Sequence, residues 1–402
     1  YGYRGNVPST SPYMLIERPE TNAVSGEKGS IISSFPNADL KWEKTSTVNV
    51  ALDWSFLRGR ISGAFEYYYS KSTDLLTDYP ISLVNGVDSW TVNEGTAVNQ
   101  GLDFNISTRN IDLDNFKWRT SLTLSYTKNK VTHSEDGLSS TSQTYTNYVS
   151  GSIIRKGSSV DGFYSYQFAG LDEYGLPRFK NLTGNNPNMS NTEFLDHIFV
   201  YSGTRTPTVY GSFSTEFSFW KRLTLRAEFS YKLGYKSRLL RLYEDADNVL
   251  PLPEKNAPAH FARRWRNPGD EANTNIPVLT NIRLDIPTGG MTDEAYTYTL
   301  VDSKFSQIAG PTSLSGWYMY DYSDLRVVRA DHIRFRAITL GYQLGGNWLK
   351  KLGVNGARLD FQMQNIGVIV FDKDIKGQDP DQIESVGMPV LPTYNLSLNL
   401  NF

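Results

Sequence analysis

The sequence of 402 residues predicts an all-β fold that forms part of a large antiparallel transmembrane β-barrel. Three observations support this prediction. Apolar and polar residues alternate with a period of two along much of the chain, which is typical of strands with one apolar face. Tyr, Phe and Trp number 25, 20 and 8, and these residues suit half-buried strands and membrane interfaces. Short and long connections between strands alternate, as they do in outer-membrane barrels.

About nine segments carry the alternation, each close to the ~10 residues that a tilted membrane strand needs. In the first of them, Val48, Val50, Leu52 and Trp54 share one face, and residues 57–60 form a turn into the next strand. The expected strands cover residues 48–56, 61–69, 102–106, 118–126, 209–219, 223–231, 338–344, 357–363 and 394–402.

The connections inside the predicted hairpins are short, whereas those between hairpins are long. The long ones cover residues 71–98, 127–206, 236–331 and 366–392. Compact domains rarely contain loops longer than ~15 residues, but outer-membrane barrels combine short periplasmic turns with long extracellular loops. We therefore expect the long segments outside the cell and the C-terminus in the periplasm. The polar face would line a lumen that holds Asp103, Arg119, Arg226, Glu228, Arg358 and Asp360.

Composition excludes several other classes of protein. A net charge of −2, from 40 basic and 42 acidic residues, argues against a nucleic-acid partner, which needs a concentrated basic face. The absence of Cys excludes a disulfide framework and thiol chemistry. The mean hydropathy of −0.42 and the lack of an apolar run of ~18 residues exclude a helical membrane protein. Residues 1–5 do not form a signal peptide, so we expect an internal start.

No motif indicates catalysis, and we predict that the chain is not an enzyme. The single histidines His133, His197, His260 and His332 lack partners at metal-ligand spacing and are interpreted as surface or loop residues. Residues 372–377 imitate the start of a calcium loop, but Ile383 stands where a bidentate Glu is required. We therefore predict no catalytic, cofactor or metal site.

Several segments, in order, carry a family resemblance. Residues 37–45 read NADLKWEKT, and residues 264–270 read RWRNPGD. Residues 328–342 read VRADHIRFRAITLGY, and residues 377–381 read GQDPD. Each motif alone is weak, but their order and spacing together resemble the SusC/RagA family of TonB-dependent outer-membrane transporters. Ala38 stands where this family usually has Pro, and His332 stands where Tyr is common.

The resemblance implies a barrel of roughly 22 strands with a plugged lumen. It also implies a SusD-like surface lipoprotein as a lid, and import of glycans or oligopeptides energised through TonB. The family's plug, its TonB-contacting segment and its N-terminal strands are not found in residues 1–402. This portion is expected from the same precursor or from a separate chain. A passive porin-like channel, a siderophore receptor and a soluble β-sandwich that binds glycans or acts as an adhesin are the alternatives.

Aromatic and acidic residues of the long loops are candidates for contact with a substrate or with the lid. They support two interpretations, which are packing within the loops or at the membrane interface, and stacking against sugar rings or peptide side chains. The candidates are Trp265, Asp270, Trp317, Tyr318, Tyr320 and Asp321. At the end of the chain, Phe402 closes an alternating strand and resembles the assembly signal of outer-membrane barrels.

Overall fold

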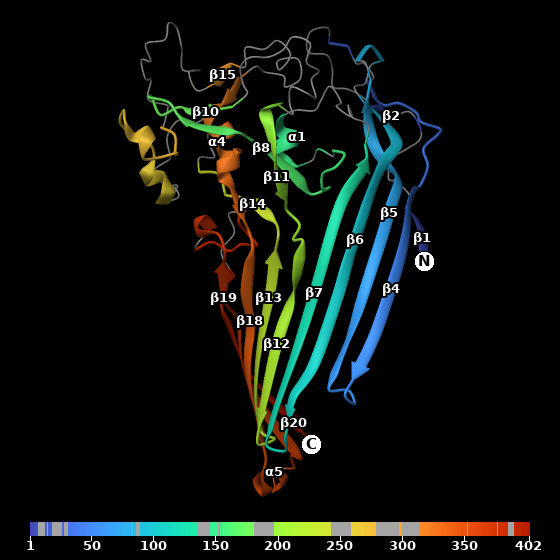
Figure 1. Ribbon diagram of the computed structural model, residues 1–402, viewed down its shortest axis with the longest axis vertical. Helices are drawn as coiled ribbons and strands as arrows, with labels where there is room; N and C mark the ends of the chain where they lie inside the picture. The colour runs from blue at the N-terminus through green and yellow to red at the C-terminus, as the bar shows by residue number, and fades with distance from the viewer. Residues whose placement is uncertain are drawn as a thin grey trace.

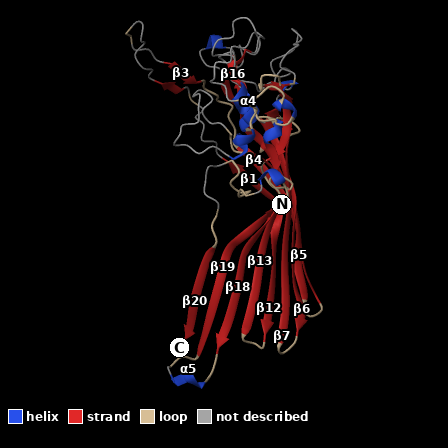
Figure 2. Ribbon diagram, turned by 90° about the vertical axis from the view of Figure 1, so that its left-hand side faces the viewer, coloured by secondary structure: helices blue, strands red, loops and turns tan. Residues whose placement is uncertain are grey.

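A computed structural model describes residues 1–6, 13, 15–17, 26–27, 31–81, 83–85, 89–134, 145–151, 153, 155–180, 197–242, 259–278, 297–299, 313–351, 353–375, 377–384 and 390–402. Ten strands form one antiparallel sheet in which neighbours in space follow one another in chain order (Figures 1 and 2). They are β1 (Gly2–Asn6), β4 (Glu43–Phe56), β5 (Ile61–Pro80), β6 (Ser89–Asp112), β7 (Phe116–His133), β12 (Val209–Phe219), β13 (Leu223–Leu233), β18 (His332–Leu344), β19 (Gly356–Val370) and β20 (Thr393–Asn401).

All nine predicted strands are confirmed, the structure adds a tenth strand, and one predicted loop is wrong. The short β1 pairs with β4, so β1 and β20 are the edges of the sheet. The expected loop at residues 71–98 is largely strand, because β5 is 20 residues long and β6 is 24. Their ladder continues to the pair Pro80 and Ser89, past a bulge at which Asp74 has a φ of 57°. Backbone hydrogen bonds hold this extension, and it needs no alternating apolar face.

The four hairpin turns lie together at one end of the sheet, which we call the turn end (Figures 1 and 2). Three of them are short, at residues 57–60, 113–115 and 220–222, and the fourth contains the helix α5 (Asn347–Lys351). The long connections lie at the opposite end, which we call the loop end. The predicted alternation of short and long connections is therefore confirmed after the first hairpin.

One face of the sheet is apolar and exposed. The register aligns one apolar row across neighbouring strands, through Trp54, Gly63, Ile106, Leu122, Phe213, Phe229 and Phe335. The rings of Phe229 and Phe335 lie 4.3 Å apart between centroids, edge to face. Monomeric soluble proteins rarely expose apolar patches larger than a few hundred Å². A face this extensive is suited to contact with lipid acyl chains.

The opposite face of the same strands is polar. Hydroxyl groups pair between neighbouring strands, as Thr123 and Ser212 do at 2.8 Å and Thr47 and Ser70 do at 3.0 Å. Arg226 and Glu228 form an ion pair at 2.7 Å along β13. This face matches the polar lumen wall expected from the sequence.

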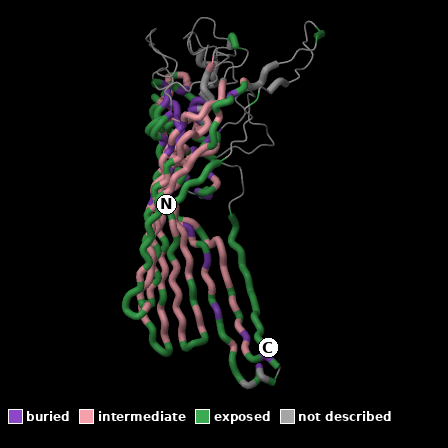
Figure 3. Tube along the Cα trace, turned by 90° about the vertical axis from the view of Figure 1, so that its right-hand side faces the viewer, coloured by how far each residue is buried: buried purple, intermediate pink, exposed green. Residues whose placement is uncertain are grey.

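The buried residues gather at the loop end, where the connections fold into what we call the loop body (Figure 3). Its core includes Tyr148, Tyr166, Phe199 and Met319. No described helix has the length and apolar character needed to cross a membrane. The loop-end elements are β2 (Leu15–Glu17), β3 (Ile31–Ser34), η1 (Leu83–Asn85), α1 (Tyr145–Ser150), β8 (Gly162–Tyr166), β9 (Phe168–Leu171), β10 (Pro177–Phe179), β11 (Phe199–Thr204), β14 (Lys236–Arg238), η2 (Ala259–Arg263), η3 (Asp270–Ala272), β15 (Thr297–Thr299), β16 (Ser313–Ser315), α4 (Gly316–Asp321), η4 (Asp324–Arg326), β17 (Val327–Arg329) and η5 (Lys373–Ile375).

We predict that an arginine is tolerated on the polar face and not on the apolar face. Phe213 lies mid-strand between Leu122 and Phe229, and its neighbour Ser214 points to the other side, opposite Glu228. A lipid-facing Arg costs roughly 2–4 kcal/mol near the bilayer midplane. Phe213→Arg should therefore lower the amount of assembled protein in the membrane fraction, whereas Ser214→Arg should leave it nearly unchanged. Equal losses in the two variants would contradict this assignment of faces.

Candidate functional site

The loop body is organised around the buried guanidinium of Arg238, at the end of β14. Its Nη1 donates to the carbonyl of Val149 at 2.8 Å, and its Nη2 donates to the carbonyl of Tyr164 and the hydroxyl of Ser165, both at 2.9 Å. Burial lowers the pKa of Arg238 to about 10, so the group stays charged at neutral pH. One cation thus ties α1 and β8 to β14.

A second arginine and a carboxylate extend this arrangement toward the last long connection. The carboxylate of Glu384 accepts hydrogen bonds from Nε of Arg205 at 3.3 Å, from the Ser237 hydroxyl at 3.2 Å and from the Arg238 backbone amide at 3.1 Å. The guanidinium of Arg205 lies 4.3 Å from the ring centroid of Phe163, and that of Arg238 lies 5.0 Å from it. Residues far apart in the sequence therefore meet in one charged and aromatic cluster.

An arginine and two tyrosines form a ladder nearer the surface of the loop body. Tyr318 and Tyr322 are one helical turn apart, and their ring centroids lie 4.5 Å from each other. The exposed Arg241 lies 4.9 Å from the Tyr322 ring and 5.8 Å from the Tyr318 ring, and it donates a hydrogen bond to the Tyr322 hydroxyl. Burial alone would lower the pKa of Arg241, but the Tyr322 hydroxyl raises it. Both tyrosines are half-buried, so the ladder combines a fixed cation with partly accessible rings.

Three other predicted contact residues lie inside the loop body. Trp317, Tyr320 and Asp321 are each 2% exposed. The Trp317 indole N–H donates to the carbonyl of Val278 at 3.0 Å, and Asp321 accepts from the Leu242 amide at 3.0 Å. Burial raises the pKa of Tyr320. These positions are those of packing side chains, and contact of these residues with a substrate stays a prediction.

The RWRNPGD segment folds into a compact turn. Trp265 is buried, and its indole N–H donates to the carboxylate of Glu271 at 2.9 Å, a bond that lowers the pKa of Glu271. Asp270 is half-buried and accepts from the backbone amides of Arg266 and Asn267, both at 3.0 Å. Gly269 has a φ of 99°, which favours glycine. The motif therefore shapes its own loop, and Glu271 is a partner that sequence analysis missed.

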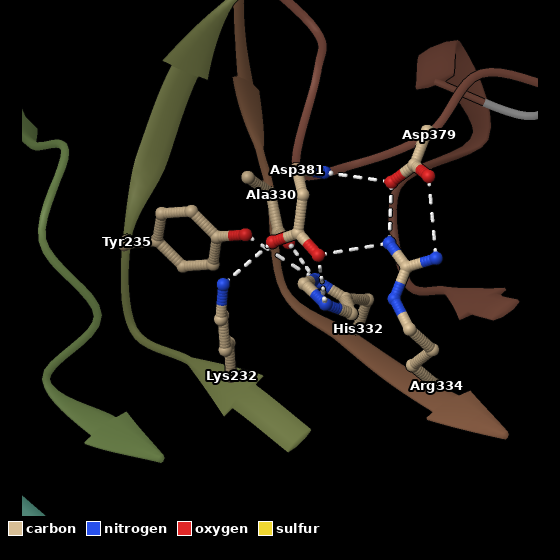
Figure 4. A network of polar contacts seen from close by, with 7 residues as sticks. All are labelled: Lys232, Tyr235, Ala330, His332, Arg334, Asp379 and Asp381. Carbon is tan, nitrogen blue, oxygen red and sulfur yellow. Dashed lines mark hydrogen bonds and ion pairs between the residues drawn. The ribbon is translucent and has the colours of Figure 1, made fainter. Parts of the chain in front are cut away.

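The last long connection is attached to the sheet by charged contacts (Figure 4). We call residues 371–384 the latch. Arg334 on β18 donates to both carboxylate oxygens of Asp379 and, at 2.8 Å, to Asp381. Lys232 on β13 donates to the other oxygen of Asp381 at 2.7 Å. The GQDPD motif, known from the sequence only as a resemblance, thus supplies both carboxylates of this attachment.

Burial would raise the pKa of both latch carboxyls, but their cationic partners lower it. For Asp379 the main opposing contribution is the hydrogen bond from Arg334, and for Asp381 it is the hydrogen bond from Lys232. Both groups are therefore ionised at neutral pH, as the ion pairs require.

The interpretation of His332 as a surface or loop histidine is wrong. This residue begins β18, is 1% exposed, and has its Nε2 3.8 Å from Asp381. Its Nδ1 lies 3.2 Å from the Tyr235 hydroxyl and 2.9 Å from the Ala330 carbonyl (Figure 4). Tyr235 and the latch cover His332. Both are distant from it in the sequence, so residue spacing could not predict its burial. Among the described residues, no group of three or more His, Asp or Glu side chains is arranged to hold a metal ion.

The sequence matches the family described as TonB dependent receptor-like, beta-barrel, over residues 2–249. This is more than half of the 402 residues, and the chain belongs to this family. Within the family it is a SusC/RagA-like chain, as the sequence motifs predicted. The family and its relatives indicate the outer membrane of a Gram-negative bacterium.

Two curated relatives align with nearly the whole chain. TonB-dependent receptor P3 of Formosa agariphila is 25% identical over 100% of this chain and 39% of its own length. TonB-dependent receptor SusC of Bacteroides thetaiotaomicron is 26% identical over 91% of this chain and 32% of its own length. The chain therefore spans less than half the length of these relatives.

Solved structures share the fold. The RagAB peptide transporter covers 100% of this chain with a TM-score of 0.67 at 20% identity. The RagAB peptide importer in the "open-open" state has a TM-score of 0.68 at 22% identity, and the chain covers 39% of it. The ten-stranded sheet and its loop body thus share the fold of part of a longer chain.

Removing the Arg334 side chain should release the latch. Arg334 and Asp379 are both buried, and removing one partner of such a pair leaves a buried charge unpaired, at a cost of about 3–5 kcal/mol. In Arg334→Ala we expect faster hydrogen exchange and proteolysis within residues 371–384. The control is Arg336→Ala, which removes an exposed arginine two positions along the same strand. If hydrogen exchange and proteolysis of the latch proceed at the same rates in the two variants, the charged contacts do not hold it.

Proposed function

We propose that this chain is the C-terminal part of an active outer-membrane importer of glycans or oligopeptides, energised through TonB, and not an enzyme. One observation carries the proposal. A single antiparallel wall with an exposed apolar face bears a folded loop body at one end, and both correspond to the SusC/RagA architecture. The similarity to a SusC receptor and to a peptide transporter supports nutrient import. The ten strands form one sheet, which argues against a soluble β-sandwich.

The rest of the barrel must come from residues outside this sequence. In the part of the chain that the structure describes, both edges of the sheet, β1 and β20, are open, and every residue of β20 is exposed. Unpaired backbone groups in a bilayer cost several kcal/mol each, so an open edge cannot persist there. Further strands, from the same precursor or from a separate chain, would close the wall and supply the plug. TonB would act through that portion.

The turn end would face the periplasm, together with the C-terminus, and the loop body would lie outside the cell. A SusD-like lipoprotein would then cover the loop body. Of the predicted contact residues, Tyr318 and Asp270 are the two that are half-buried and partly accessible to a substrate or to this lid. The buried residues Trp265, Trp317 and Tyr320 would act indirectly, by supporting them.

Uptake by the complete transporter tests the function. Cells that carry its gene should accumulate a labelled oligosaccharide or oligopeptide only when TonB is present. Deletion of the lid lipoprotein gene should lower uptake without removing the barrel from the membrane. Uptake that continues without TonB would indicate a passive channel instead.

Deleting Phe402 should impair assembly more than stability. Phe402 follows β20 and is exposed, so it contributes little packing within the chain. If it is an assembly signal, its deletion should lower insertion in cells, measured as heat-modifiable barrel in the outer membrane. Thermal unfolding of the barrel that does assemble should change little. Normal insertion of the deletion variant would contradict the signal.

A further inference from the structure

The turn end exposes large apolar side chains where turns are usually small and polar. Each of the four hairpin connections carries one: Leu57 is 67% exposed, Leu113 63%, Trp220 68% and Trp348 52%. Gly, Asn, Asp, Ser and Pro dominate ordinary turns, because they adopt the required dihedral angles and stay solvated. These four side chains therefore need a reason beyond turn formation.

Two of the turns keep bulky residues in a strained backbone conformation. Leu57 and Arg58 have φ values of 54° and 56°, and Trp220 and Lys221 have values of 50° and 58°. A side chain in this left-handed region is disfavoured, and Asn or Gly would relieve the strain. Stability of the turns alone would not favour Leu or Trp at these positions.

The helix α5 presents its aromatic residue in the same way. Leu349 is buried against Val354 and Ala357, and this contact fixes the helix to the β18–β19 hairpin. Trp348 and Lys351 stay exposed on it. The helix lies at the extreme turn end of the molecule (Figure 1). This anchored helix therefore exposes a Trp and a Lys at the turn end, where the other turns also expose large apolar side chains.

The charge of the turns is positive. Residues 57–60, 113–115, 220–222 and 345–355 contain six basic residues and one acidic residue. The acidic residue, Asp114, lies 3.7 Å from Lys221, and nearby Asp112 pairs with Lys117 at 3.0 Å. Arg58 and Arg222 are exposed beside the apolar side chains of their turns. Three of the four turns thus combine basic residues with an exposed Leu or Trp.

We propose that the rim formed by these four turns binds the anionic phospholipid headgroups of the periplasmic leaflet. Trp220, Trp348 and the exposed leucines would enter the boundary between headgroups and acyl chains, where amphipathic rings are favoured. The basic residues beside them would contact the phosphates. The rim continues the apolar face of the wall, since Phe219 on β12 packs against Trp220 with 5.8 Å between ring centroids. The proposal rests on the orientation given under the proposed function.

Lipid retention by the complete transporter, purified in detergent, tests the proposal. Native mass spectrometry would measure binding of phosphatidylglycerol, phosphatidylcholine and lipid A. A basic residue near an anionic surface contributes about fivefold in affinity, so Lys221→Gln with Arg222→Gln should weaken phosphatidylglycerol binding about 30-fold. The matched control neutralises two exposed cations at the loop end, Arg263→Gln with Lys373→Gln, and should change it little.

A second variant separates binding from folding. Trp220→Asn should raise the unfolding temperature in detergent, because it relieves a strained position, and should still weaken phosphatidylglycerol binding. Equal phosphatidylglycerol binding by the turn and control variants would overturn the proposal. A preference for lipid A would also overturn it, and so would equal binding of phosphatidylglycerol and phosphatidylcholine. TonB-dependent uptake with no lipid preference would refute this inference alone. Lipid preference without any uptake would refute only the proposed function.

Discussion

The hydrogen-bond requirement of backbone groups in lipid is the constraint on which the rest of this structure depends. Water is absent from the bilayer core, so each strand must pair with neighbours on both sides. The ladder from β1 to β20 satisfies this requirement for the eight inner strands, and neighbouring strands of the sheet follow one another in chain order. The alternating faces then follow, because successive side chains of a paired strand point to opposite sides.

The loop body is stabilised by different interactions. Its connections have no lipid to face, and they are too irregular to form one sheet, so they need a core of their own. Aromatic rings supply half of the buried residues of the core around Tyr148, and Arg238 donates hydrogen bonds to the backbone carbonyls of Val149 and Tyr164. The latch joins this body to the wall through charges, because Arg334 and Lys232 lie on the polar face of the strands. The same alternation that exposes apolar rows to lipid thus presents cations to the latch.

The strands could be predicted because their signal is local. Each of them carries its own period of two, and a short apolar run of this kind is readable without knowledge of its neighbours. The loop body could not be predicted, since its contacts join residues such as Arg238 and Val149, which are 89 positions apart. Burial of Trp317 and Trp265 depends on such contacts, and composition indicated only that aromatic residues were present. The resemblance located the latch motif but did not reveal its partners.

The start of β18, which includes the buried His332, was missed because the alternation of apolar residues breaks within this strand. Apolar residues occupy odd positions at Ile333 and Phe335 but even positions at Ile338 and Leu340, so the alternation breaks between them. A break of this kind is the ordinary sign of a strand end. In the structure the strand continues, because a bulge leaves Arg336 without a partner on β13 and shifts the register by one residue.

That one-residue shift determines the site as well as the wall. Without it, one of the two halves of β18 would turn its apolar residues to the polar face. With it, Phe335 lies on the apolar face beside Phe229, and His332 and Arg334 face the other side, where Asp379 and Asp381 meet them. The bulge therefore lets a single strand present a continuous apolar surface to the membrane and a cationic anchor to the loop end. A break in periodicity that follows a His or Arg in an alternating run is thus a signal of a bulge and an anchor as much as of a strand boundary.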